Sequence, residues 1–131
     1  MKRIHLMLKV ENLEQSIDFY SKLFGVAPTK RKEDYAKWML DDPHVNFSIA
    51  EREGVKGIEH LGIETDSEAE LQGLRDNIDR IQARKREEGQ TTCCYANSDK
   101  SWVTDPQGVE WEAFYTFGES ESYSEVEQAC C

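Results

Sequence analysis

The chain has no long hydrophobic run. No segment approaches the roughly 18 consecutive apolar residues that a membrane-spanning helix needs. The apolar stretch from Ile4 to Leu8 is too short, and too soon followed by Lys9 and Glu11, to be the core of a secretory signal peptide. These absences favour a cytoplasmic protein, and the cytoplasm keeps cysteine thiols reduced.

Basic side chains are fewer than acidic ones. The 131 residues include 16 basic and 26 acidic side chains, which gives a formal net charge of −10. A chain of this charge is repelled by nucleic acids and by anionic membrane surfaces, so neither is expected as a partner. The length fits a single domain with a sizeable core.

Cysteine is rare and unusually placed. The four cysteines form two adjacent pairs, Cys93-Cys94 and Cys130-Cys131, which fits neither a disulfide framework nor a C-x-x-C zinc motif. Neighbouring Cα atoms lie about 3.8 Å apart, whereas a disulfide needs about 4.4–6.8 Å, so a bridge within a pair would be strained. Two free thiols in a loop can instead hold one soft, thiophilic atom from both sides.

This use of the first pair requires a turned backbone. In a regular strand Cys93 and Cys94 would point to opposite faces. We therefore expect an irregular loop at this position, mobile when nothing is bound. The alternative is that one thiol packs inward and the other has no role.

The N-terminal half begins with a strand and a helix. Residues 3–10 alternate between Ile4, Leu6, Leu8 and Val10 on one face and His5, Met7 and Lys9 on the other, the period of a half-buried strand. A helix follows, with Asn12 as its N-cap and Gly25 as its stop.

The same pattern returns further along the chain. Residues 58–64 alternate like a strand, and Ser67 with Glu70 forms a capping box before a second helix. Aligning the two strands places His5 over His60. The apolar stripe of this second helix is Leu71, Leu74, Ile78 and Ile81.

The ends of the two halves match as well. Asp42-Pro43 and Asp105-Pro106 each mark a turn before a strand, and aligning these strands places Ser48 over Glu112. Such repetition predicts an α+β fold of two βαβββ modules, about 1–54 and 55–117, within one domain of residues 1–117. The modules would form a curved, cup-shaped sheet with the helices outside. Residues 118–131 are expected to be an acidic flexible tail.

Three candidate metal ligands lie on equivalent strand faces. His5, His60 and Glu112 each lie opposite an apolar face, so they would converge on the concave side of the cup. Two imidazoles and one carboxylate form the facial set that binds ferrous iron and leaves positions open. The fourth repeat-related position holds Ser48, a weak ligand, which predicts an open site.

Each ligand has a competing interpretation. A single histidine near a strand end is more often structural or exposed, but two at repeat-equivalent positions are harder to explain that way. Glu110 is a rival for Glu112, and the repeat alignment favours Glu112. Trp38, Trp102 and Trp111 are expected in the core or lining the cup.

Over residues 1–117 the chain resembles the vicinal oxygen chelate superfamily, which includes glyoxalase I, bleomycin resistance proteins and extradiol dioxygenases. The resemblance rests on the paired modules, the two histidines, and Asp105-Pro106-Gln107-Gly108 followed by Glu112. Within that superfamily, the segments 35–38, 91–96 and 98–100 are similar to ferrous carbon–arsenic lyases and to cadmium-induced proteins of resistance operons.

The resemblance implies a non-haem, dioxygenase-type enzyme for arsenic detoxification. It would use Fe(II) and O2 to cleave the carbon–arsenic bond of trivalent organoarsenicals, for example methylarsenite to arsenite. The two histidines and Glu112 would bind the metal and carry catalysis. Cys93 and Cys94 would hold the arsenical, and Lys100 would stabilise a thiolate or an oxygen-derived anion; a solvated surface lysine is the alternative for Lys100.

Two other functions remain open. One is a non-catalytic resistance protein that binds cadmium or arsenite through its thiols. The other is a glyoxalase- or fosfomycin-type thiol transferase with another divalent metal, ranked last because no basic pocket for a glutathione carboxylate is evident. Cys130 and Cys131 would either pass arsenic inward or be incidental. A homodimer is an expectation at the level of the family.

Overall fold

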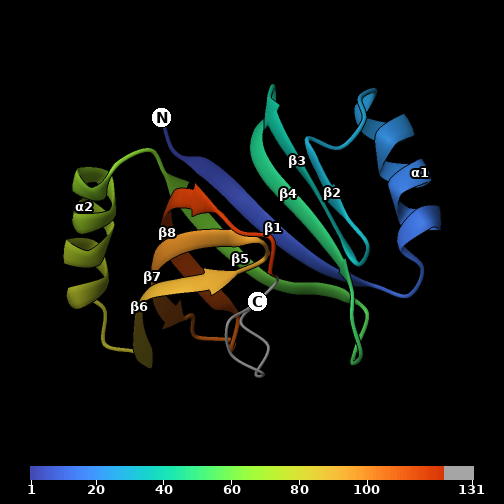
Figure 1. The fold of residues 1–131 in the computed structure, drawn as a ribbon. Helices are drawn as coiled ribbons and strands as arrows, with labels where there is room; N and C mark the ends of the chain where they lie inside the picture. The colour runs from blue at the N-terminus through green and yellow to red at the C-terminus, as the bar shows by residue number, and fades with distance from the viewer. Residues whose placement is uncertain (123–131) are drawn as a thin grey trace. The chain divides into compact units, whose positions relative to one another are not determined.

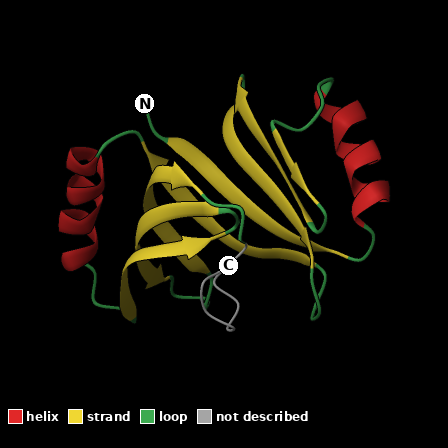
Figure 2. Cartoon of the chain, in the orientation of Figure 1, coloured by secondary structure: helices red, strands yellow, loops and turns green. Residues whose placement is uncertain are grey.

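The computed structural model describes residues 1–122 and divides the chain into two compact units. The first unit is residues 4–59, and the second unit contains residues 1–3 and the chain from His60 onward. Each unit contains one helix and four strands (Figures 1 and 2).

The first unit has the order βαβββ. Its strand order is β2-β3-β4-β1, in which β1 runs parallel to β4 and the other neighbours are antiparallel. The elements are β1 (Arg3–Val10), α1 (Leu13–Phe24), β2 (Lys30–Lys32), β3 (Tyr35–Asp41) and β4 (His44–Glu51).

Helix α1 forms where the sequence predicts it. The Asn12 side chain caps it by accepting from the Gln15 amide at 2.9 Å, and Gly25 ends it with a φ of 74°. One face of the helix packs on an aromatic core around Trp38 and Phe47. The expectation that Trp38 belongs to the core is therefore confirmed.

The second unit repeats this order. Its sheet is arranged β6-β7-β8-β5, with β5 parallel to β8 and the other neighbours antiparallel. The predicted α+β fold of two βαβββ modules is confirmed. The elements are β5 (Gly57–Thr65, whose first three residues belong to the first unit), α2 (Glu68–Asp79), β6 (Lys85–Cys93), β7 (Ala96–Thr104) and β8 (Glu110–Glu119).

The strand register gives the repeat an independent check. In the first unit Met7 lies opposite Ser48, two residues after His5. In the second unit Gly62 lies opposite Glu112, two residues after His60. The equivalence of Ser48 and Glu112, inferred from the sequence, therefore holds in the register of both sheets.

Helix α2 begins as predicted and ends earlier. Ser67 Oγ accepts from the Glu70 amide at 3.1 Å, and Glu70 reaches back to the Asp66 amide at 2.7 Å. The helix ends at Asp79, so Ile81, expected in its apolar stripe, lies beyond it and is 42% exposed. The last turn is of the 3₁₀ type, because the Ile81 amide donates to the Ile78 carbonyl, three residues earlier.

A cavity of about 580 Å³ lies between α2 and strands β5, β7 and β8. Its lining surface is mostly apolar and includes Leu74, Ile78 and Trp111. The equivalent position under α1 is filled by the rings of Tyr20 and Phe24. The cavity therefore reflects smaller side chains on the second helix.

The C-terminal strand is longer than the sequence indicates. β8 continues to Glu119, two residues beyond the predicted domain boundary at 117, because Gly118 and Glu119 pair with β7. Residues 123–131, with Cys130 and Cys131, lie outside the described residues. Within residues 1–122, no helix is long and apolar enough to cross a bilayer.

Candidate functional site

A buried histidine–carboxylate pair lies on β5 and β8 of the second unit. His60 Nε2 is 3.3 Å from Glu112 Oε2, and both side chains are 2% exposed. Because Glu112 lies opposite Gly62 and side chains alternate along a strand, both groups are on the sheet face away from α2. Glu110, the rival ligand, is exposed near the start of β8.

The spacing of this pair suits two ligands of one cation. Ligand atoms bonded to one metal at about 2.1 Å and at angles of about 90–109° lie about 3.0–3.4 Å apart. A direct charge-assisted hydrogen bond is shorter, at about 2.7–2.9 Å. The observed 3.3 Å falls in the first range, so the donor set fits a shared divalent metal.

The His5 ring is held in one orientation within the first unit. Its Nδ1 lies 3.1 Å from the Asn46 carbonyl oxygen, in a buried contact. A carbonyl oxygen only accepts, so Nδ1 is the donor in this contact, and in the neutral imidazole Nε2 then carries the lone pair. Metal-binding histidines are typically oriented in this way by their second nitrogen.

Ser48, the repeat-related counterpart of Glu112, is engaged within the first unit. Its hydroxyl lies 2.9 Å from the Tyr35 hydroxyl and 3.3 Å from Asn46 Oδ1. This position therefore carries a hydrogen-bonded hydroxyl rather than a second carboxylate.

Lys100 is buried beside Glu112. Its side chain is 4% exposed, and its Nζ lies 3.4 Å from Glu112 Oε1 and 5.6 Å from the centre of the Phe114 ring. The alternative of a solvated surface lysine is therefore wrong. The two oxygens of Glu112 are divided, Oε1 toward Lys100 and Oε2 toward His60.

Trp102 lies beside the pair of His60 and Glu112. Trp102 is on β7, opposite Glu112 of β8, and its ring contacts the His60 ring edge-on, with centroids 5.0 Å apart. Its indole N–H donates to Glu88 Oε1 at 2.8 Å, which fixes the ring plane. The contacts of Trp102 with His60 and Glu88 could not be identified from the sequence. Trp111 lies elsewhere in the unit and lines the cavity under α2.

The adjacent cysteines form the tip of the β6–β7 hairpin. Cys93 pairs with Ala96, so Cys94 and Tyr95 are the two turn residues, with φ angles of 53° and 62°. Two positive φ values define a type I′ turn, which non-glycine side chains adopt at some cost. The backbone is turned, as the sequence requires, but the predicted irregular loop is a tight hairpin.

The turn brings the two sulfurs together. The Sγ atoms of Cys93 and Cys94 lie 3.5 Å apart, well beyond a disulfide length of about 2.05 Å, so they are not bonded to each other. Neither is a free thiol in the structure. Taking a thiolate–zinc bond of about 2.3 Å as a guide, two thiolates on one soft atom lie about 3.3–3.8 Å apart. The observed 3.5 Å falls in this range.

The two sulfurs and the Glu112 carboxylate lie beside different positions of β7. Ala96 is the partner of Cys93, and Trp102, six residues further on, is the partner of Glu112. At about 3.3 Å per residue, this separation is about 20 Å along the strand. Lys100 lies between the two positions.

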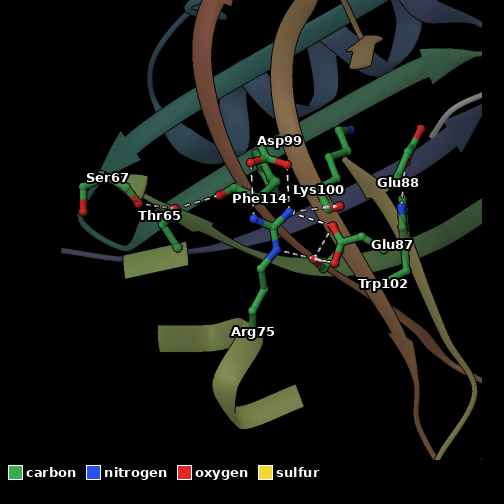
Figure 3. A network of polar contacts seen from close by, with 10 residues as sticks. Thr65, Ser67, Arg75, Glu87, Glu88, Asp99, Lys100, Trp102 and Phe114 are labelled. Carbon is green, nitrogen blue, oxygen red and sulfur yellow. Dashed lines mark hydrogen bonds and ion pairs between the residues drawn. The ribbon is translucent and has the colours of Figure 1, made fainter. Parts of the chain in front are cut away.

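A network around Arg75 joins α2 to β6 and β7 (Figure 3). The guanidinium donates to Asp99 at 2.7 Å, to Ser101 at 2.7 Å and to Glu87 at 2.7 Å. The hydrogen bond to Asp99 is the largest cause that raises the pKa of Arg75 above its ordinary value. Because side chains alternate, fixing Asp99 and Ser101 under α2 also fixes Lys100 on the opposite face.

A family model described as Glyoxalase/Bleomycin resistance protein/Dioxygenase superfamily matches residues 2–113. The chain belongs to this superfamily. It is 44% identical to the trivalent organoarsenical cleaving enzyme of Bacillus sp. (strain MD1), over 100% of this chain and 83% of that protein. It is 37% identical to the cadmium-induced protein CadI of Mycobacterium bovis (strain ATCC BAA-935 / AF2122/97), over 94% of this chain and 82% of that protein.

Among solved structures, the chain is similar to homoprotocatechuate 2,3-dioxygenase from Arthrobacter globiformis. The TM-score is 0.65 and the identity 19%, over 92% of this chain and 38% of that one. At this identity the likeness shows the fold alone.

The Arg75 network predicts a loss of stability for Arg75→Lys. Lysine keeps the charge but cannot span three acceptors, so we expect unfolding to require about 1–2 kcal/mol less. Because the pKa of Arg75 is raised in the folded protein, its charged form stabilises the fold until the pH reaches strong alkali. The loss of unfolding free energy in Arg75→Lys should therefore be the same at pH 6 and pH 9. The shift of the urea midpoint, at an unchanged dependence of unfolding free energy on urea concentration, measures this loss.

The matched control is Arg80→Lys on the exposed end of the same helix. Its stability should change by less than about 0.5 kcal/mol. Equal losses in the two variants would show that the network adds nothing specific.

The strained turn predicts that Cys94→Gly is more stable than Cys94→Ser. Glycine adopts a positive φ freely, so the difference should be about 0.5–1 kcal/mol after removal of the same sulfur. Thermal unfolding of the two reduced proteins measures it. A serine variant as stable as the glycine variant would contradict the assignment of strain to this turn.

Proposed function

We propose that the protein cleaves the carbon–arsenic bond of trivalent organoarsenicals such as methylarsenite, using ferrous iron and O2, in the reducing cytoplasm. The observation that carries this proposal is a hairpin tip with two sulfurs 3.5 Å apart, in the same unit as a buried histidine–carboxylate pair. A 44% identical relative named as an organoarsenical cleaving enzyme supports it.

His5, His60 and Glu112 would hold the iron. Two imidazoles and one carboxylate suit Fe(II) and leave coordination positions open. The tautomer of His5, set by the Asn46 carbonyl, and the 3.3 Å spacing of His60 and Glu112 support this role. When bound, the iron supplies the activation of O2.

Lys100 would keep Glu112 in a single binding mode. By holding Oε1, it leaves Oε2 beside His60 as the ligand atom. Its ammonium also offsets the charge of a carboxylate that would be costly to bury alone. Its burial in this position favours this role over contact with the distant thiols.

Cys93 and Cys94 would bind the substrate in their reduced form. A trivalent arsenical with one carbon substituent has two exchangeable hydroxyl groups, and two thiols replace both, with release of two water molecules. The arsenic–carbon bond is then the one left to point outward, and two attachments fix its direction before reaction. The overall reaction balances as methylarsenite plus O2 giving arsenite plus formaldehyde.

The hairpin must move during the reaction. The sulfurs and Glu112 are about 20 Å apart along β7 in the register of the second unit. The tip therefore has to bend over the sheet face that carries Lys100 for the carbon to approach the iron. Without such bending the pair would only store the arsenical.

Simple storage is the second candidate function, and the likeness to CadI favours it. Cysteine thiolates bind cadmium and arsenite well. This function needs neither iron nor oxygen, so turnover separates the two. Stoichiometric cadmium binding that survives loss of His5 and His60, with no product released, would establish it.

The direct test is turnover by the purified protein alone. Reduced protein is loaded with Fe(II) without oxygen, then given methylarsenite and O2, and arsenite and formaldehyde are measured. We expect equal amounts of both. Iron-loaded protein that releases neither product would contradict the lyase function.

Glu112→Gln tests the metal site, with Glu110→Gln as its control on the same strand. We expect Glu112→Gln to weaken Fe(II) or Co(II) binding at least about 100-fold, because an amide is a poor ligand. Equilibrium dialysis measures the binding. The exposed Glu110 should tolerate the change, and equal affinities in both variants would exclude Glu112 as a ligand.

A further inference from the structure

A second hollow of the second unit lies beside Trp102. Its volume is about 280 Å³, and it is lined by Arg84, Lys85, Arg86, Trp102, Thr104 and Glu110. Three cations and one carboxylate line it, although the whole chain has a net charge of −10. The hollow is therefore locally basic.

The hollow is on the same sheet face as His60 and Glu112. Arg86 lies opposite Trp102, and Trp102 lies opposite Glu112, so their side chains share one face. The Trp102 ring contacts His60 edge-on at 5.0 Å, and the Arg86 guanidinium carbon lies 4.9 Å from the centre of the same ring. Trp102 thus lines the hollow and also contacts His60.

The two arginines differ in how far they are already engaged. Arg86 Nη1 is 3.8 Å from Glu88 Oε1, a long contact to an oxygen that also accepts from Trp102 at 2.8 Å. Within residues 1–122, the side chain of Arg84 has no ion pair. Lys85 donates to the Asp79 carbonyl at 3.4 Å, toward α2. Arg84 and Arg86 are therefore the cations that can meet a ligand.

We infer that this hollow binds a carboxylate on the aromatic ring of a substrate. A guanidinium matches a carboxylate with two parallel hydrogen bonds, and an indole edge accommodates a flat ring. A ring held along Trp102 would place its charged end between the arginines and its opposite end beside His60. The hollow is then a specificity subsite for anionic aromatic arsenicals.

Only the substrate role rests on the proposed function, because binding of the carboxylate is a separate property. Benzoate tests that property in the metal-free, reduced protein. We expect benzoate, but not neutral benzamide, to shift the indole N–H resonance of Trp102, identified with Trp102→Phe. Arg84→Gln should weaken benzoate binding at least 10-fold, and Arg86→Lys, which loses the two-pronged contact, should weaken it as well.

Arg80→Gln is the control, since it removes one exposed arginine charge from the same unit. It should keep the benzoate affinity of the parent protein. No benzoate binding, or equal binding in Arg84→Gln and Arg80→Gln, would overturn the subsite. Circular dichroism and urea unfolding establish that each variant is folded.

Selectivity tests the substrate role. The ratio of kcat/KM for 4-carboxyphenylarsenite to that for phenylarsenite should fall at least 10-fold in Arg84→Gln relative to Arg80→Gln. An unchanged ratio, together with Arg84-dependent benzoate binding, would overturn the assignment to a substrate substituent. Arg84-dependent benzoate binding in a protein that cleaves no arsenical would retain the carboxylate subsite and reject the lyase function.

Discussion

The buried carboxylate of Glu112 is the group on which the candidate site depends. Its oxygens face His60 Nε2 at 3.3 Å and Lys100 Nζ at 3.4 Å. Burying an anion is costly unless each oxygen has a positive or donating neighbour. Lys100 meets this need for one oxygen, and the proposed metal, shared with His60, would meet it for the other.

Strand β7 links this carboxylate to the rest of the second unit. Its side chains alternate between two faces. Arg75 holds Asp99 and Ser101 under α2, whereas Lys100 and Trp102 lie on the face that carries His60 and Glu112. At its start, the hairpin carries the two sulfurs. One strand therefore connects the helix, the proposed substrate clamp and the proposed metal ligands.

The repeat made much of this predictable. Two copies of one unit place His5 and His60 at equivalent positions, and the Asp-Pro turns fix the strand that carries Glu112. The contacts of Lys100 and Trp102 were not predictable. β7 has polar residues on both faces, so its sequence does not show which face is buried or which residues of β8 lie opposite it. The tight turn was missed because Cys94-Tyr95 lacks the glycine or asparagine typical of such turns.

The most direct test measures how near the substrate carbon comes to the metal. Nuclear relaxation of carbon-13 methylarsenite by Mn(II) in the reduced protein falls with the sixth power of that distance. The account predicts strong enhancement, as at contact distance, that is lost when Cys93 and Cys94 are both replaced by serine. Relaxation that corresponds to a carbon remaining about 20 Å away, the separation along β7, would contradict it.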